Sequence, residues 1–472
     1  MNGARLSPFE SILWRATQDP SRRLTVGVLI LLDHPLEEKD LLAQVNAAVE
    51  RAPRLRCRPD DPTFTHIRPT WAVEDHVDPE HHVRFVGVPA PGTLREVLDV
   101  VTLLEATPFD SDHSPWDLTV LQPVEDGRAA LYARAHHVLT DGVGGVRLLQ
   151  VLFDSDAPEA DGKPVVRSVP SRSHEPPKDA GDDDAAGWSG KVTIDLGRAA
   201  RSLSNGIGIA RETQPLGTVV RGLQRALDLA NSVSRQVMVM GGPLSPLPAS
   251  HSVSSHFEVL SVGKAREAAI ALGGSRNDLL VGAVATAVAL YAERLGEPCS
   301  RVRIAMPARQ RRDGALGGNW FAPTRVEVPA VTHHPARQFA IISERLAQAR
   351  HEPALAITDT LVSAISLLPN RVLLPALQSQ ANAVDLAVTT IPGIRGRPRI
   401  CGAEVQEAYP MGPRLGVPLN VTAFGSGDRL DIGITLDTAA ITVPQGFLEC
   451  LEEAFRRFSD SESAAVAVGV HH

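Results

Sequence analysis

Apolar positions along the chain follow two different spacings, which together predict a mixture of strands and helices in both halves. Residues 24–32 form an almost unbroken apolar run rich in Val, Ile and Leu, which is typical of a buried strand. Shorter runs of the same kind predict strands at 118–122, 129–135, 253–261, 301–306, 324–328, 386–390, 419–423 and 429–436. Apolar residues at helical spacing predict helices over 38–51, 94–106, 277–295 and 337–350, and another that starts at 264. The pattern therefore indicates the α+β class.

One segment interrupts this pattern. Residues 154–190 hold repeated Pro and Ser, an Asp182-Asp183-Asp184 run and few large apolar side chains, so we expect a linker there. A chain of 472 residues is also longer than a domain with a single hydrophobic core usually is. We therefore expect a first domain at 1–153 and a second at 191–472, with residues 191–240 helical in pieces.

The most confidently predicted helix lies at 277–295. Asn277 can cap its first turn, Asp278 suits the positive end of its dipole, and Gly296 can end it. Its apolar core, 279–292, is shorter than the roughly 20 residues that cross a bilayer, so we interpret it as a core helix.

Net charge and cysteine spacing exclude several classes of function. A net charge of −8 argues against a nucleic-acid partner, and the first 20 residues show no secretory signal pattern. The four cysteines are widely separated and form no CxxC pair. A disulfide framework or a cysteine zinc site is therefore not expected, and a cytoplasmic location fits best.

The segment HHVLTDG, which follows the strand at 129–135, is the strongest candidate for chemistry. A neutral imidazole of His136 or His137 is a suitable general base at cellular pH, and Gly142 permits close approach of a substrate. Structural alternatives are open: His136 could bond to backbone, and Asp141 could cap the next helix. His and Asp also bind metals, but no third ligand is near, so no metal is expected here.

HHVLTDG resembles the HHxxxDG signature of the CoA-dependent acyltransferase superfamily. Further segments resemble, in the right order, the bacterial wax ester synthase/diacylglycerol acyltransferase family. They are Leu6–Glu10, Pro108–Asp117, Asn277–Leu280, Gly318-Asn319, Thr390–Gly393, Tyr409–Pro413 and Leu419–Thr422.

The resemblance implies two chloramphenicol-acetyltransferase-like domains, each a mixed sheet with helices, that meet at a tunnel. His137 would be the general base, with His136 and Gly142 beside it, and Asp141 would orient the segment through an arginine. Asn277, Asp278 and Trp116 would belong to the substrate-binding part, although helix capping and core packing are structural alternatives for them. The co-substrate would be acyl-CoA, with no further cofactor.

The partner would be a lipid alcohol, diacylglycerol or a long-chain alcohol, met at a lipid surface or droplet to which the protein binds peripherally. Two other functions stay open. An acyl carrier protein could replace CoA as donor, as in condensation enzymes. The chain could also be a degenerate lipid-binding relative, which the departure from the family pattern at Ser114-Pro115 favours and the intact His137 and Asp141 disfavour.

Overall fold

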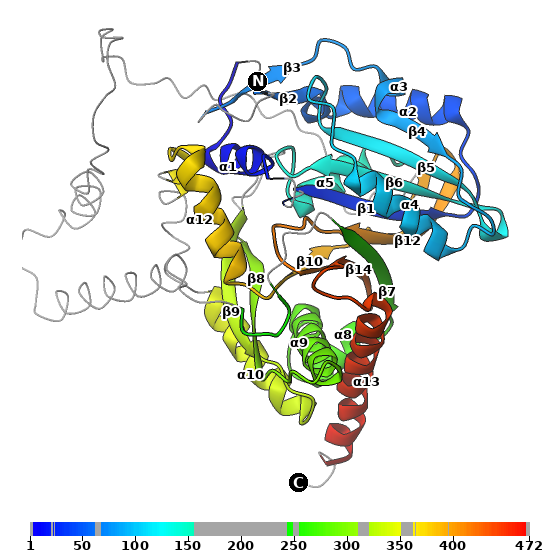
Figure 1. Ribbon diagram of the computed structural model, residues 1–472. Helices are drawn as coiled ribbons and strands as arrows, with labels where there is room; N and C mark the ends of the chain where they lie inside the picture. The colour runs from blue at the N-terminus through cyan, green and yellow to red at the C-terminus, as the bar shows by residue number, and fades with distance from the viewer. Residues whose placement is uncertain are drawn as a thin grey trace, which may run out of the picture. The chain divides into compact units, whose positions relative to one another are not determined.

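Two six-stranded sheets with covering helices organise the protein (Figure 1). The computed structural model describes residues 3–19, 22, 24–61, 68–154, 243–248, 254–309, 321–350, 362–363, 365–394 and 396–468. Both sheets combine parallel and antiparallel strand pairs. The expected α+β class is thereby confirmed.

The first sheet takes most of its strands from the first third of the chain. In spatial order they are β11 (Arg399–Ile400), β12 (Ala403–Met411), β1 (Thr25–Leu32), β6 (Arg128–His136), β5 (Trp116–Val124) and β4 (Val83–Val86). β4 and β5 are parallel, and the other pairs are antiparallel. A two-stranded sheet, β2 (Cys57–Asp60) with β3 (Thr70–Val73), lies beside it. The accompanying helices are α1 (Pro8–Ala16), α2 (Glu38–Arg51), α3 (Pro79–His82), α4 (Leu94–Ala106) and α5 (Gly142–Gln150).

Strand β1 is apolar along most of its length because both of its faces are covered. Ile30 and Leu32 belong to a core that includes side chains of α2, whereas Leu29 and Leu31 belong to a second core that includes side chains of α4. Successive side chains of a strand point to opposite faces, so a strand between two cores needs apolar residues at every position. The continuous run at 24–32 follows from this position.

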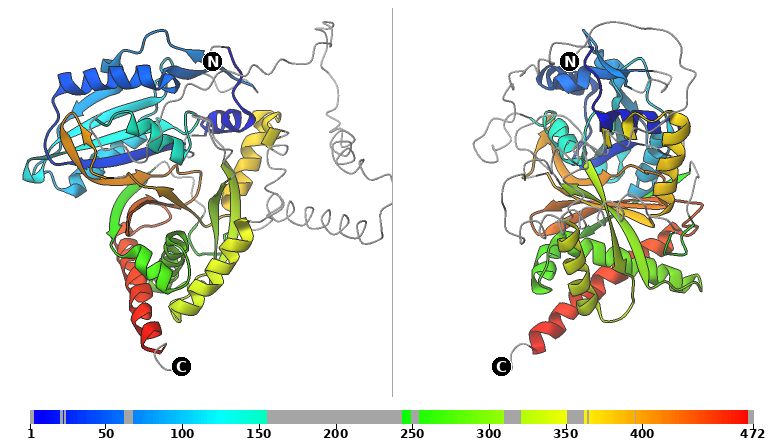
Figure 2. Two further views of the ribbon diagram at one scale, coloured as in Figure 1. Left: turned by 180° about the vertical axis from the view of Figure 1, so that it is seen from behind. Right: turned by 90° about the vertical axis from the view of Figure 1, so that its left-hand side faces the viewer.

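The second sheet comes from the C-terminal half. Its spatial order is β7 (Ser255–Val262), β14 (Arg429–Asp437), β13 (Leu419–Ser426), β10 (Leu386–Pro392), β8 (Arg301–Arg309) and β9 (Phe321–Pro329). Strand β10 is parallel to both of its neighbours. The helices of this half are α8 (Ala265–Ala271), α9 (Arg276–Arg294), α10 (Pro335–Arg350), α12 (Asn370–Asn382) and α13 (Pro444–Val468). Side chains of α8, α9, α10 and α13 form one large core with this sheet. Figure 2 shows the sheets and helices from two further sides.

The C-terminal half also contributes to the first sheet. Strand β12 runs antiparallel to β1, with Leu29 opposite Tyr409 and Gly27 opposite Met411. The sequence did not predict this strand, and no local pattern indicates which sheet it joins. The predicted domain limits stay a prediction, because residues 155–242, with the expected linker and helical pieces, lie outside the described residues.

Strand and helix predictions agree with the observed elements within a few residues. The helix expected at 277–295 is α9, but its N-cap is Ser275 rather than Asn277, since the Ser275 hydroxyl accepts the Asp278 N–H. Its C-terminal end matches, with Gly296 at a φ of +77°. None of the described helices is long and apolar enough to cross a membrane.

Candidate active site

The HHVLTDG segment joins the end of β6 to the start of α5 and is anchored by backbone hydrogen bonds. β6 lies between β1 and β5, with His136 opposite Thr25 and Ala135 opposite Trp116. The His137 N–H donates to the Leu24 carbonyl at 2.6 Å, which continues this pairing one residue beyond the strand. The position of the His137 backbone is therefore fixed by the central strands of the first sheet.

His136 is buried with both ring nitrogens engaged. Its Nδ1 accepts the Val138 N–H at 3.0 Å, so Nε2 carries the proton in the neutral ring and donates to the Thr17 hydroxyl at 2.8 Å. The hydroxyl in turn donates to the Leu13 carbonyl at 3.1 Å. Burial, together with the neighbouring His137, lowers the pKa of His136 to about 3. His136 is held by these contacts inside the protein and is not among the described residues that line the cavity.

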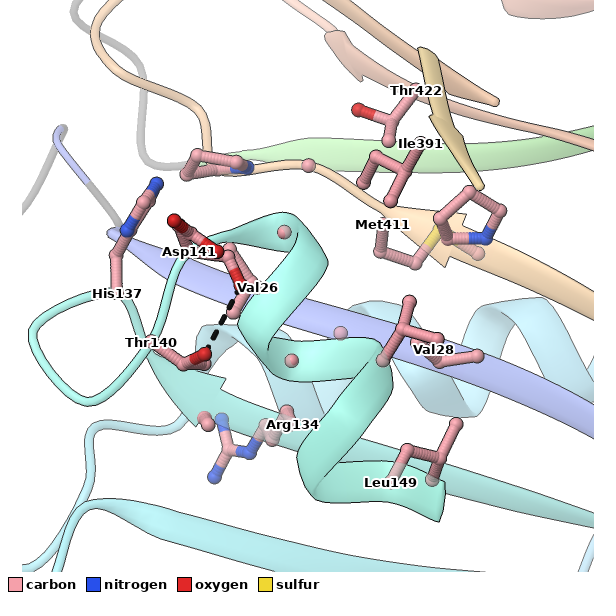
Figure 3. A pocket seen from close by; sticks show the side chains of 18 of the residues that line it. Val26, Val28, Arg134, His137, Thr140, Asp141, Leu149, Ile391, Met411 and Thr422 are labelled. Atoms are coloured by element: carbon pink, nitrogen blue, oxygen red, sulfur yellow. Dashed lines mark hydrogen bonds between the residues drawn. The ribbon is translucent and has the colours of Figure 1, made fainter. Parts of the chain in front are cut away.

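His137 lines a cavity of about 230 Å³ between the two sheets and is 7% exposed (Figure 3). The cavity wall is mainly apolar. From the first half it includes Val26, Val28, Val45, Leu148, Leu149 and Leu152, and from the second half Ile391, Met411 and Phe424. A titratable side chain at the wall of an apolar cavity is a typical arrangement for a site that binds an apolar substrate.

Asp141 caps helix α5. Its carboxylate accepts the Gly144 N–H at 2.7 Å, and its own backbone is extended, as in an N-cap. Among the described residues no ion pair joins it to an arginine, and the arginine partner stays a prediction. Asp141 nevertheless lines the cavity together with His137 and Gly142 (Figure 3).

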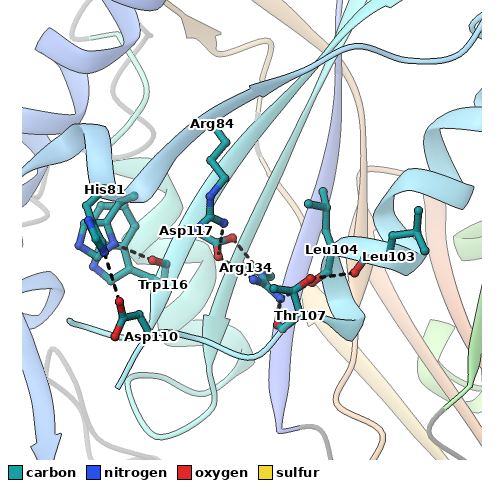
Figure 4. A network of polar contacts seen from close by, with 10 residues as sticks. His81, Arg84, Leu103, Leu104, Thr107, Asp110, Trp116, Asp117 and Arg134 are labelled. Atoms are coloured by element: carbon teal, nitrogen blue, oxygen red, sulfur yellow. Dashed lines mark hydrogen bonds and ion pairs between the residues drawn. The ribbon is translucent and has the colours of Figure 1, made fainter. Parts of the chain in front are cut away.

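A buried arginine–carboxylate pair does lie close to the site, between Arg134 and Asp117. Arg134 Nε and Nη2 donate to the two carboxylate oxygens of Asp117 at 2.8 and 2.7 Å, and Nη1 donates to the Thr107 carbonyl at 2.7 Å (Figure 4). The side chains are 1% and 6% exposed. Because Arg134 lies three residues before His137 on β6, this pair holds the strand that positions the histidine.

Two glycines at the start of α5, Gly142 and Gly144, are required by space. A Cβ at Gly142 would lie 2.6 Å from Ile391 Cδ1 of β10, and a Cβ at Gly144 would lie 2.4 Å from the Thr140 hydroxyl oxygen. The contact of Gly142 with Ile391 joins α5, which follows the first sheet, to β10 of the second sheet. Gly142 thus lets the start of α5 approach the second half of the chain closely.

Trp116 lines the cavity, as expected for a substrate-binding residue, and is also part of the core. Its indole N–H donates to the Leu55 carbonyl at 2.8 Å. The opposite result holds for Asn277 and Asp278, which are not among the described cavity-lining residues. Asp278 closes a capping box with Ser275 and pairs with Arg350 at 3.1 Å, so its carboxylate has structural contacts, and its part in substrate binding stays a prediction.

The second sheet supplies polar cavity residues that the sequence did not single out as site residues. Thr389 and Thr390 on β10, and Asn420 and Thr422 on β13, line the wall. Thr422 donates to the Asn420 side-chain oxygen, and the Asn420 amide donates to the Pro413 carbonyl, both at 2.8 Å. Three of the four lie in segments that resembled the family, Thr390 in Thr390–Gly393 and the other two in Leu419–Thr422. Polar side chains in otherwise buried strands are the signal that could have identified them.

Comparisons with known proteins identify a family. Residues 6–280 match the wax ester synthase/diacylglycerol acyltransferase catalytic domain, and residues 317–459 match the C-terminal domain of the same family. The chain is 29% identical over 460 residues to a candidate diacylglycerol O-acyltransferase of Mycobacterium tuberculosis, covering 95% of this chain and 90% of that protein.

Two solved structures are similar in fold. The wax ester synthase/diacylglycerol acyltransferase from Marinobacter aquaeolei VT8 has a TM-score of 0.61 at 19% identity, over 98% of this chain and 100% of that chain. A variant of the starter condensation domain of rhizomide synthetase RzmA, in complex with C8-CoA, has a TM-score of 0.58 at 13% identity, over 98% of this chain and 95% of that chain.

Proposed function

Because the chain belongs to the wax ester synthase/diacylglycerol acyltransferase family, we propose that it transfers a fatty acyl group from acyl-CoA to diacylglycerol or a long-chain alcohol, with His137 as general base. The protein is an acyltransferase by its family. The observation that carries the rest of the proposal is the position of His137 at the wall of a mainly apolar cavity between the two sheets. Such a wall suits hydrocarbon chains and excludes water from the reacting groups.

The proposed reaction needs one base, which first takes a proton from the alcohol and later gives it to the leaving group. An imidazole nitrogen of His137 takes the hydroxyl proton while the alcohol oxygen attacks the thioester carbonyl. The carbon–sulfur bond then breaks, and the imidazolium returns the proton to the thiolate of CoA. A positioned base of this kind contributes roughly 10²–10⁴ in rate. Both ring nitrogens of His136 are hydrogen-bonded inside the protein, so we assign the base to His137, which lines the cavity.

The charge that develops on the carbonyl oxygen needs donors or a positive potential. The start of α5, which brings Gly142 to the cavity wall, offers the positive end of a helix dipole. The Thr390 hydroxyl is a second candidate, since its oxygen is buried without a hydrogen-bond partner among the described residues. Trp116 would form part of the wall that holds the chain of the substrate.

The test is an acceptor panel with one acyl donor. Palmitoyl-CoA is incubated with dipalmitoylglycerol, with hexadecanol and with no acceptor, while free thiol and lipid product are measured. We expect thiol release that depends on acceptor, and its near-complete loss in His137→Ala. Transfer from an acyl carrier protein but not from CoA would favour the condensation-type alternative. The absence of any transfer, with acyl-CoA still bound, would favour a lipid-binding role.

We also propose peripheral association with lipid surfaces, because the proposed acceptors are insoluble in water. Flotation with anionic and neutral liposomes is expected to recover part of the protein, and mild detergent to release it. Recovery of all protein in the aqueous fraction, at every lipid composition, would argue against it.

A further inference from the structure

A second group of ionisable side chains lies in the N-terminal half, outside the set that lines the cavity. Glu74 follows β3, His82 is the last residue of α3, and His113 precedes β5. One potential ligand atom from each of these residues lies within 4.8 Å of the other two. Three separate chain segments thus bring an imidazole–imidazole–carboxylate set together.

His82 is the most informative member of this group. Its side chain is buried, with the residue 2% exposed, and its Nδ1 lies 2.7 Å from the Trp116 carbonyl oxygen. A carbonyl can accept but not donate, so Nδ1 carries the proton. The neutral ring with its proton on Nδ1 has its lone pair on Nε2. Among the described residues, Nε2 has no hydrogen-bond partner.

This arrangement is the one that metal-binding histidines adopt. A ligating imidazole binds the ion through one nitrogen and donates its other N–H to a backbone carbonyl or a carboxylate, which fixes the tautomer. A buried nitrogen lone pair without a donor also destabilises the fold unless some group satisfies it. The indole of Trp116 stacks on the His82 ring at 4.0 Å and 9°, which holds the ring in this orientation.

Glu74 and His113 have the separation expected of two ligands on one ion. His113 Nδ1 lies 3.5 Å from Glu74 Oε2, long for a hydrogen bond. Two ligands at about 2.1 Å from a tetrahedral zinc ion are about 3.4 Å apart. The other carboxylate oxygen of Glu74 accepts the Ser114 N–H, which orients the group.

We propose that Glu74, His82 and His113 bind one divalent transition-metal ion, with Zn²⁺ as the best fit to two imidazoles and a carboxylate. His81 and Asp110 form an adjoining group with His113 and lie 3.4 Å from each other, so further donors are available at the exposed side (Figure 4). The bound ion would tie the end of β3, helix α3 and the turn before β5 together behind Trp116. This site is distinct from the His137–Asp141 segment, where the sequence predicted no metal.

The test is zinc binding by the full chain, purified without a polyhistidine tag and stripped with EDTA. Calorimetric titration with Zn²⁺ is expected to show one site per chain that Glu74→Gln and His113→Ala weaken by at least about tenfold. The matched control is His34→Ala, which removes an exposed histidine that also pairs with a carboxylate, Asp33, at 2.7 Å. The control is expected to bind zinc as the wild type does.

Melting temperatures separate loss of a ligand from loss of the fold. Glu74→Gln keeps an acceptor for the Ser114 N–H, and His113 is one-third exposed, so neither substitution should disturb the fold. In EDTA, both variants should therefore have melting temperatures close to that of the wild type. Zinc should raise the melting temperature of the wild type and of His34→Ala by a few degrees. The melting temperatures of the two ligand variants should not change. A wild type without a saturable site, or ligand variants that fold and bind zinc as tightly as His34→Ala, would overturn the proposal.

Discussion

Two isosteric substitutions close to His137, Asp117→Asn and Asp141→Asn, should differ sharply in their effect on stability although each removes one negative charge. The Asp117 carboxylate accepts two hydrogen bonds from the Arg134 guanidinium, and both side chains are almost completely buried. The Asp141 carboxylate accepts a backbone N–H from Gly144 instead. An asparagine can replace the second interaction but not the first.

The magnitudes follow from these contacts. In Asp117→Asn one oxygen becomes an NH₂ group that faces another donor, and the Arg134 charge is left uncompensated, which costs about 3–5 kcal/mol. In Asp141→Asn the remaining oxygen still caps α5, so we expect a change below about 0.5 kcal/mol. If all 472 residues unfolded together, the unfolding entropy would be about 1 kcal/mol/K. The melting temperature should therefore fall by at least about 3 °C in the first variant and by less than about 1 °C in the second.

Urea denaturation and calorimetry of both variants, with turnover measured in parallel, provide the assay. Asp99→Asn is the control, because Asp99 makes an exposed ion pair with Arg95 worth at most about 1 kcal/mol. Equal destabilisation by Asp141→Asn and Asp117→Asn would show that Asp141 has the buried charge partner that the sequence suggested. A large fall in rate for Asp141→Asn, with an unchanged melting temperature, would mean that Asp141 orients His137 directly.

Three other substitutions and conditions test the same site. His137→Ala should lose nearly all activity in the thiol-release assay, whereas His136→Ala should keep a measurable fraction; an inactive but folded His136 variant beside an active His137 variant would reverse their roles. Gly142→Ala should cost about 1–3 kcal/mol by overpacking against Ile391 Cδ1, and Ile391→Val should restore part of it; a double variant no more stable than Gly142→Ala would contradict the clash. Between pH 6.5 and about 3 the unfolded chain protonates His136 while the folded one does not, so stability should fall as pH falls, by up to about 1.4 kcal/mol per unit. His136→Gln should reduce this slope in urea denaturation at pH 7 and 5.5, and an unchanged slope would mean that His136 titrates normally.

The local elements were predictable because their signals are local. The run at 24–32 reads as a buried strand and is β1, and the capping residues around 275–296 delimit α9 to within one or two residues. Position 137 could be selected through the resemblance of HHVLTDG to a known signature. Its cavity, in contrast, is built from both sheets, and no spacing within one strand reports which residues lie across from it.

The partners of charged residues were the weakest part of the sequence prediction. The local pattern offered a helix cap for Asp141, as observed, but nothing local indicates that Asp117 pairs with an arginine. Asp278 shows the same limit. Its place at a helix start fits capping and substrate binding equally well. No local pattern predicts its contact with Arg350, 72 residues away.

The first 153 residues should fail to fold alone, for a reason that also lies outside local sequence. In the whole protein β1 is an inner strand, paired with β6 on one side and with β12 on the other. Without 399–411, β1 becomes an edge whose backbone groups are unpaired and whose side chains are nearly all apolar, the arrangement that promotes aggregation. Its core also loses Ile400, Val405 and Phe424. We expect a fragment of residues 1–153 to be insoluble and to become soluble when residues 233–472 are co-expressed. A soluble, cooperatively melting 1–153 fragment would show that β12 is dispensable and that the first domain is independent of the C-terminal half.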